Sequence, residues 1–109
     1  MSAAATQMAR LRALCPGAEL WDDGGAPLVF LPGLLVESAG SKHRLDALLS
    51  PQAREGYESR LYFSAKLPIN RNWAAHAIKA RNWFAFSWRG ITAGQPWLDI
   101  LAGHLEAAK

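Results

Sequence analysis

The stretch RNWFAFSW, residues 81–88, contains one side chain that can act as a nucleophile, Ser87, placed between two aromatic residues. A serine hydroxyl attacks poorly at neutral pH unless a neighbouring base takes its proton. His76 is the nearest histidine in sequence, and imidazole is the most common general base in enzymes. Asn70 or Asn72 can offer an amide donor to a developing oxyanion. These residues are candidates for chemistry at Ser87, with His76 as the base and Asn70 or Asn72 as the oxyanion donor.

The same four side chains also have a purely structural interpretation. A serine inside an aromatic strand is often a small residue that leaves room for bulky neighbours, and fold alone does not determine function. A histidine at such a position is often a partly buried side chain with one nitrogen satisfied. Asn70 and Asn72 favour turns, so they can do no more than shape the loop before residue 73. The sequence leaves both interpretations open.

Length and composition limit the class of protein. A chain of 109 residues has room for one domain, because two halves of this size would each bury too little apolar surface. Half of the residues are hydrophobic and 19% are charged, which is typical of a folded globule. No apolar run approaches the roughly 20 residues of a membrane span. Arginines interrupt the apolar stretch of residues 1–15, which therefore does not resemble a signal peptide, and we expect a cytoplasmic protein.

The sequence predicts no metal site and no cofactor. Cys15 is the sole cysteine, and His43, His76 and His104 are far apart along the chain, so the ligand spacing of a zinc site is missing. No glycine-rich phosphate loop follows a predicted strand, and the Gly24-Gly25 pair is typical of a plain turn.

Hydrophobic periodicity predicts an α+β domain over residues 1–109. We expect an amphipathic helix over residues 1–15, a small antiparallel sheet over residues 28–91 and a helix over residues 95–108. The last helix is predicted to bury one apolar stripe, made of Trp97, Leu98, Leu101, Leu105 and Ala108. Helices packed on one side of a small antiparallel sheet are the simplest arrangement of these elements.

Three segments inside the sheet region receive more specific predictions. Residues 28–36 contain Pro32-Gly33 in a β-rich run, which indicates a strand with a bend or two short strands. The run LDALLS, residues 45–50, is equally compatible with a helical turn and a buried strand. Residues 74–83 are compatible with a short helix. If residues 81–88 are extended, Phe84, Phe86 and Trp88 share one face, and Trp83, Ala85 and Ser87 share the other.

Several of these segments resemble a known family. The run GYESRLYFSAKLPIN resembles the part of ubiquitin-conjugating enzymes in which a Tyr-Pro turn leads through a strand to a His-Pro-Asn loop. Tyr57 matches the turn tyrosine, and Asn70 matches the loop asparagine. With LPGLLV, RNWFAFSW and LAGHL, the chain resembles a bacterial group of ubiquitin-conjugating-like proteins over residues 28–105. The resemblance implies a compact ubiquitin-conjugating-like fold, with an activating-enzyme-like protein and a ubiquitin-like protein as partners.

The chain departs from this family where the family performs its chemistry. Ubiquitin-conjugating enzymes carry the ubiquitin-like protein on a cysteine that follows the asparagine loop, and residues 73–88 contain no cysteine. Two hypotheses follow. In the first, Ser87 accepts the activated carboxyl terminus as an oxyester, while Arg71, Arg81 and Arg89 hold the negative end of the flexible tail. In the second, the chain is an inactive adaptor that docks a partner, and the family implies that Arg10 and Arg12 of the first helix help to recognise the activating enzyme.

The charge distribution suggests a further alternative. The formal net charge is +3, and no acidic residue lies between Glu58 and Asp99. Basic residues alternate with aromatics in RNWAAHAIKARNWFAFSWR, a pattern that can pair phosphates and stack bases. We keep a nucleic-acid-binding module as the alternative. As a binding partner of this chain, nucleic acid is less expected than the activating-enzyme-like protein and the ubiquitin-like protein.

Overall fold

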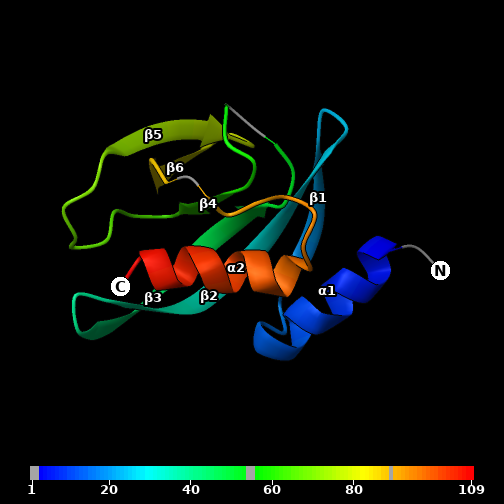
Figure 1. Cartoon of the computed structure of the whole chain (residues 1–109), viewed down its shortest axis with the longest axis horizontal. Coiled ribbons are helices and arrows are strands. Elements are labelled where there is room, and N and C mark those ends of the chain that lie inside the picture. Colours follow the sequence, from blue (N-terminus) through cyan, green and yellow to red (C-terminus); the bar gives the residue numbers. More distant parts are fainter. Residues whose placement is uncertain (1–2, 54–55, 89) are drawn as a thin grey trace.

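The computed structural model describes residues 3–53, 56–88 and 90–109, and its elements are shown in Figure 1. In chain order they are α1 (Ala3–Leu14), β1 (Glu19–Asp23), β2 (Ala26–Ser38), β3 (Ser41–Ser50), β4 (Arg60–Phe63), β5 (Trp73–Ile78), β6 (Arg81–Phe86) and α2 (Trp97–Ala107). Neither helix is long and apolar enough to cross a membrane.

The expected fold class is wrong. The strands form one six-stranded antiparallel sheet in the order β1-β2-β3-β4-β6-β5, so the described part of the chain is mostly β with two short helices. The structure is therefore not the predicted α+β domain with a small sheet and a ubiquitin-conjugating-like fold. The difference has a local cause: the sequence prediction missed β1 and β5 and left β3 undecided, so it underestimated the sheet.

Both helices cover one face of the sheet (Figure 1). Leu11 of α1 and Leu101 of α2 are fully buried against strand residues such as Val29 and Leu49. Burying a leucine-sized side chain contributes about 2 kcal/mol, so this layer supplies much of the driving force for folding. The side-chain oxygen of Gln7 accepts a hydrogen bond from the backbone N–H of Trp97 at 3.0 Å, which satisfies a donor at the start of α2.

The opposite face is buried without a helix. Its core contains Leu28, Leu48, Tyr62, Ile78, Trp83 and Ala85, with Trp21 and Phe30 packed against them. Trp83 is fully buried, and Phe30 lies between Trp21, with which it stacks, and the edge of Trp83. Lys79, in the turn after β5, donates a hydrogen bond to the backbone oxygen of Asp22 at the end of β1. The sheet therefore curls until strands from its two ends pack against each other.

The predicted bend in residues 28–36 is confirmed. β2 pairs with β3 along most of its length, and the register shifts between Leu31 and Leu34. Gly33 lies in this bulge at φ +61°, a conformation that favours glycine. Its N–H donates to the Asp46 carboxylate at 2.8 Å, and its carbonyl accepts from Arg44 at 2.8 Å.

The short helix expected over residues 74–83 is wrong, because these residues belong to the β5–β6 hairpin. The hairpin turns through Lys79 and Ala80, which have φ values of +52° and +60°. Such a two-residue turn normally uses Asn-Gly or Asp-Gly. The predicted alternation is confirmed within β6, since Trp83 and Ala85 lie in one core cluster and Phe86 in the other, whereas Ser87 and Trp88 lie beyond the strand.

Both terminal helices are confirmed, but the stripe predicted for the last one is displaced. Of the predicted stripe, Leu101 and Ala108 are fully buried, while Trp97, Leu98 and Leu105 are partly buried against the core. Ile100, His104 and Ala107, which were not predicted, are also buried. The helix is therefore rotated relative to the prediction and brings His104 into the interior.

Replacing Ala80 by glycine tests the turn. An alanine in the left-handed region costs about 1 kcal/mol, and glycine would remove this strain. Part of the stabilisation is offset because glycine makes the unfolded chain more flexible. We expect Ala80→Gly to raise the free energy of unfolding by roughly 0.5 kcal/mol in urea denaturation. The matched control, Ala77→Gly in the adjacent strand, should lower it by a similar amount. Equal destabilisation by both substitutions would contradict the turn.

Candidate functional site

The structure does not bring the predicted catalytic side chains together. Ser87 is exposed at the end of β6, and its N–H donates to the Asn72 carbonyl at 3.2 Å. His76 lies opposite Trp83 in the hairpin register. Trp83 precedes Ser87 by four residues, so His76 and Ser87 are separated by roughly 13 Å at the rise of a strand. Its ring packs edge-on against Tyr62, with centroids 5.2 Å apart. Asn70 is exposed in the loop before β5. Direct proton transfer from Ser87 to His76 is therefore not possible in this arrangement.

A different serine and histidine do make contact. Ser59 lies just before β4, and its Oγ is 2.9 Å from Nε2 of His104 in α2 and 2.6 Å from the backbone oxygen of Ile91. A carbonyl can only accept, so the serine hydroxyl donates to Ile91 and His104 donates to the serine. This direction is the reverse of a nucleophile activated by a base.

Burial confirms that this pair is structural. Ser59 is 2% exposed and His104 is 3% exposed. The adjacent cavity, lined by residues that include Tyr57, Ser59 and Trp88, has a volume of about 100 Å³, well below the roughly 300 Å³ of a small-molecule site. The hydrogen bonds instead connect β4, the segment before α2 and α2 itself. Sequence spacing gave no sign of the contact, although His104 follows Ile100 and Leu101 at helical spacing on the buried side.

Acidification tests the Ser59–His104 contact. Burial, with a smaller contribution from the positive charge of Arg60, lowers the pKa of His104 to about 4 from its ordinary value of 6.5. Below pH 6.5 the unfolded chain takes up a proton that the folded chain refuses, so stability falls by about 1.4 kcal/mol per pH unit down to the folded pKa. We expect the free energy of unfolding to drop by roughly 2 kcal/mol between pH 7 and pH 5.

The control for this prediction is His104→Gln, which cannot titrate and should lose most of that pH dependence. An NMR titration of the His104 ring in the unaltered protein gives a second readout that does not require the variant to fold. A ring pKa near 6.5 would contradict the buried, neutral histidine.

The cations predicted to bind a partner do not form one surface. Arg81 pairs with Asp46 at 2.9 Å. Arg71 donates to the Ala107 carbonyl at the end of α2, and its guanidinium lies over the ring of Trp88 at 5.0 Å. In α1, Arg12 donates to the carbonyl of Ala18 and is exposed.

The other cations of the prediction and of the basic segment lie elsewhere. Arg10 is exposed on α1. The prediction for Arg89 lies outside the described residues. Arg60 of the basic segment is buried beside the rings of Tyr57 and Tyr62. Arg60, Arg71 and Arg81 are thus occupied in the interior, at the end of α2 and in an ion pair, whereas Lys66 and Lys79 are exposed.

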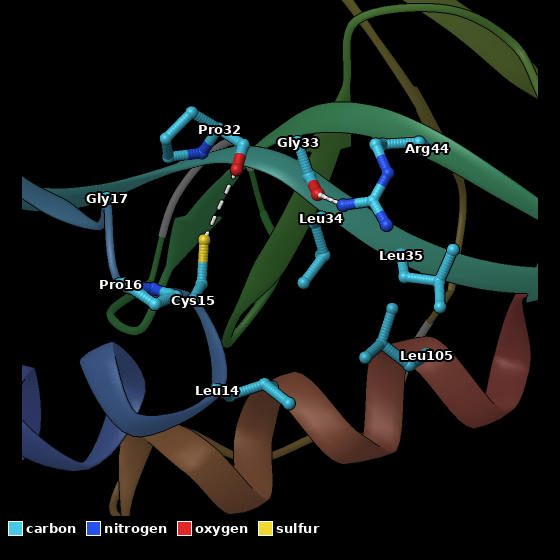
Figure 2. Close-up of a pocket in the computed structure, with 10 residues that line it drawn as sticks. All are labelled: Leu14, Cys15, Pro16, Gly17, Pro32, Gly33, Leu34, Leu35, Arg44 and Leu105. Carbon is cyan, nitrogen blue, oxygen red and sulfur yellow. Dashed lines mark hydrogen bonds between the residues drawn. The ribbon is translucent and has the colours of Figure 1, made fainter.

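A groove that sequence reasoning missed lies where α1 ends (Figure 2). It has a volume of about 410 Å³, within the usual range of ligand pockets. Figure 2 shows side chains from three elements pointing toward it: Leu14 at the end of α1, Leu34 and Leu35 on β2, and Leu105 on α2. Leu14 is 54% exposed and Leu35 is 47% exposed, so two large apolar side chains border the groove in contact with water.

The far wall of the groove is the bulge of β2. The Cys15 thiol donates to the carbonyl of Pro32 at 3.3 Å, and burial raises the pKa of this thiol, which makes it a poor nucleophile. Arg44 is exposed on the rim and uses one nitrogen to donate to Gly33. A guanidinium has five donors, so the rest of the group is available to a carboxylate.

Within the described ranges, no three histidine, cysteine, aspartate or glutamate side chains lie close enough together to hold a metal ion. A scan against models of protein families, a search of curated proteins and a search of solved structures each found no match to this chain.

Proposed function

We propose that this chain is a non-catalytic adaptor that binds a partner protein in the groove between α1, β2 and α2. The observation that supports this most strongly is the pair of exposed leucines, Leu14 and Leu35, beside a depression of about 410 Å³. Exposed apolar side chains that border a concave surface are typical of sites that another molecule covers.

The chemistry of the groove favours a specific kind of partner. Its leucines and prolines suit leucine-sized side chains, whereas the free part of the Arg44 guanidinium suits a carboxylate. The occupant is therefore a segment of a folded protein that presents an apolar anchor next to an aspartate or glutamate. A small molecule without this combination would leave either the leucines exposed to water or the Arg44 guanidinium without a carboxylate partner.

The pathway remains the one that the sequence motifs suggest. The ubiquitin-conjugating-like fold was not found, so this assignment depends only on motifs such as GYESRLYFS and RNWFAFSW. An activating-enzyme-like protein and a ubiquitin-like protein are the first partners to test, and a cytoplasmic location stays a prediction. Oxyester formation at Ser87 is the second candidate, favoured by the exposure of that residue at the end of β6.

An activation assay separates the two functions. The chain would be incubated with the ubiquitin-like protein, the activating enzyme and ATP, with the activating enzyme's own adduct as the positive control. The adaptor predicts no covalent adduct on this chain, because His76, the base predicted for Ser87, lies roughly 13 Å from it along the strand. An adduct that resists thiol reductant, is cleaved by hydroxylamine and is absent from Ser87→Ala would establish the acceptor role instead.

A charge placed in the groove tests the docking site. We expect Leu35→Asp to weaken binding of the activating enzyme or the ubiquitin-like protein by at least about tenfold in calorimetry, because an anchor position loses its apolar contact. Leu20→Asp is the matched control, since Leu20 is 44% exposed on β1 and lies outside the groove. Equal affinity of both variants would contradict the groove. Failure of the unaltered chain to bind either protein would contradict the pathway.

A further inference from the structure

We propose that the outer edge of β5 is a second binding site, which accepts an extended acidic peptide of another protein as a seventh strand. β5 is the last strand of the sheet and, within the described residues, pairs with β6 alone. Addition of a strand to such an edge is a common mode of peptide recognition, in which backbone hydrogen bonds supply the affinity. This surface is separate from the groove at α1.

The register identifies the backbone groups that would bind. The Asn72 carbonyl accepts from Ser87, and Ile78 faces Arg81 across the two-residue turn. In an antiparallel pair, hydrogen-bonded positions alternate, so even-numbered residues of β5 direct their N–H and C=O groups toward β6. The N–H and C=O groups of Ala75 and Ala77 therefore point away from the sheet.

This edge lacks the features that usually protect a free strand. Natural edges are shielded by charged side chains, prolines or bulges. The other edge strand, β1, follows that rule, because three of its five residues are acidic. β5 has the sequence WAAHAI, with no charge and no proline, and Ala74, Ala75 and Ala77 are exposed. Their small side chains leave room for bulky residues on an added strand.

Charges at the two ends of β5 favour an acidic partner over a second copy of the chain. Arg71 precedes the strand and Lys79 follows it, and both are exposed. If two copies paired antiparallel about Ala75, Arg71 of each copy would face Lys79 of the other, and like charges directly opposite are unfavourable. A peptide with a carboxylate at each end would meet Lys79 at one end and, at the other, the donors of Arg71 that its bond to Ala107 leaves over. The acidic β1 strand is already beside Lys79 within the same chain, through the contact with Asp22.

The probe is a synthetic peptide of about nine residues, with alternating threonine and valine between two terminal glutamates. Calorimetry with the full chain should detect binding that weakens as salt is raised. Methylation of the peptide's central amide nitrogen, opposite Ala75, should weaken binding by about tenfold or more, because it removes an inter-strand hydrogen bond. Methylation of the next amide nitrogen in the peptide is the matched control. That nitrogen faces away from β5, so the affinity should stay unchanged.

Two protein variants complete the test. Asparagine adopts the positive φ of the turn, so Lys79→Asn keeps the hairpin. It should lower the affinity for the glutamate peptide by about threefold and leave the affinity for a peptide with terminal glutamines unchanged. Ala75→Pro removes the outward N–H without removing a bond to β6 and should abolish binding; its circular dichroism spectrum must match that of the unaltered chain. The proposal is overturned if the glutamate peptide does not bind, if both methylated peptides bind equally, or if sedimentation shows that the chain self-associates through β5.

Discussion

Both candidate binding surfaces depend on the contacts of one carboxylate, that of Asp46 on β3. One of its oxygens accepts the N–H of Gly33 in the β2 bulge, and the other accepts Arg81 at the start of β6. These two bonds, the one from Gly33 above all, lower the pKa of Asp46 below its ordinary value. The bulge forms a wall of the groove, and β6 positions β5, so Asp46 links the geometry of one surface to that of the other. Because the carboxylate is partly exposed, its ion pair with Arg81 contributes little energy. Its main role is to hold the β2 bulge and the start of β6 in position.

The architecture explains why binding is a better account than catalysis. A single sheet has two faces, and here the helices cover one while the curl of the sheet buries the other. The buried serine and histidine connect α2 to β4, and His76, the base predicted for the exposed Ser87, is four residues away in the register. Among the surfaces that the fold leaves in contact with water are a leucine-lined groove and an uncharged strand edge. Two separate surfaces of this kind suit an adaptor, which brings partners together without reacting with either.

The parts of the fold that the sequence predicted are those with strong local signals. The helices at both ends have apolar periodicity; α1 ends just before Pro16-Gly17, α2 begins just after Pro96, and Pro32-Gly33 indicated the bend in β2. The β5–β6 hairpin was missed because Lys79 and Ala80 are not turn formers, and alanine-rich residues 74–77 favour a helix by propensity. Long-range contacts were the other failure. Nothing in the local sequence joins Ser59 to His104, or places Leu14 and Leu35 around one groove, because the packing of the helices on the sheet determines both.

Amide hydrogen exchange on the free chain tests the central claim, that the fold leaves backbone and apolar groups open for partners, most directly at β5. The account predicts alternation along the strand: fast exchange at Ala75 and Ala77, with slow exchange at Ala74 and Ile78, whose N–H groups face β6. Equal protection of all four amides would show that the edge is already covered, and would contradict the account.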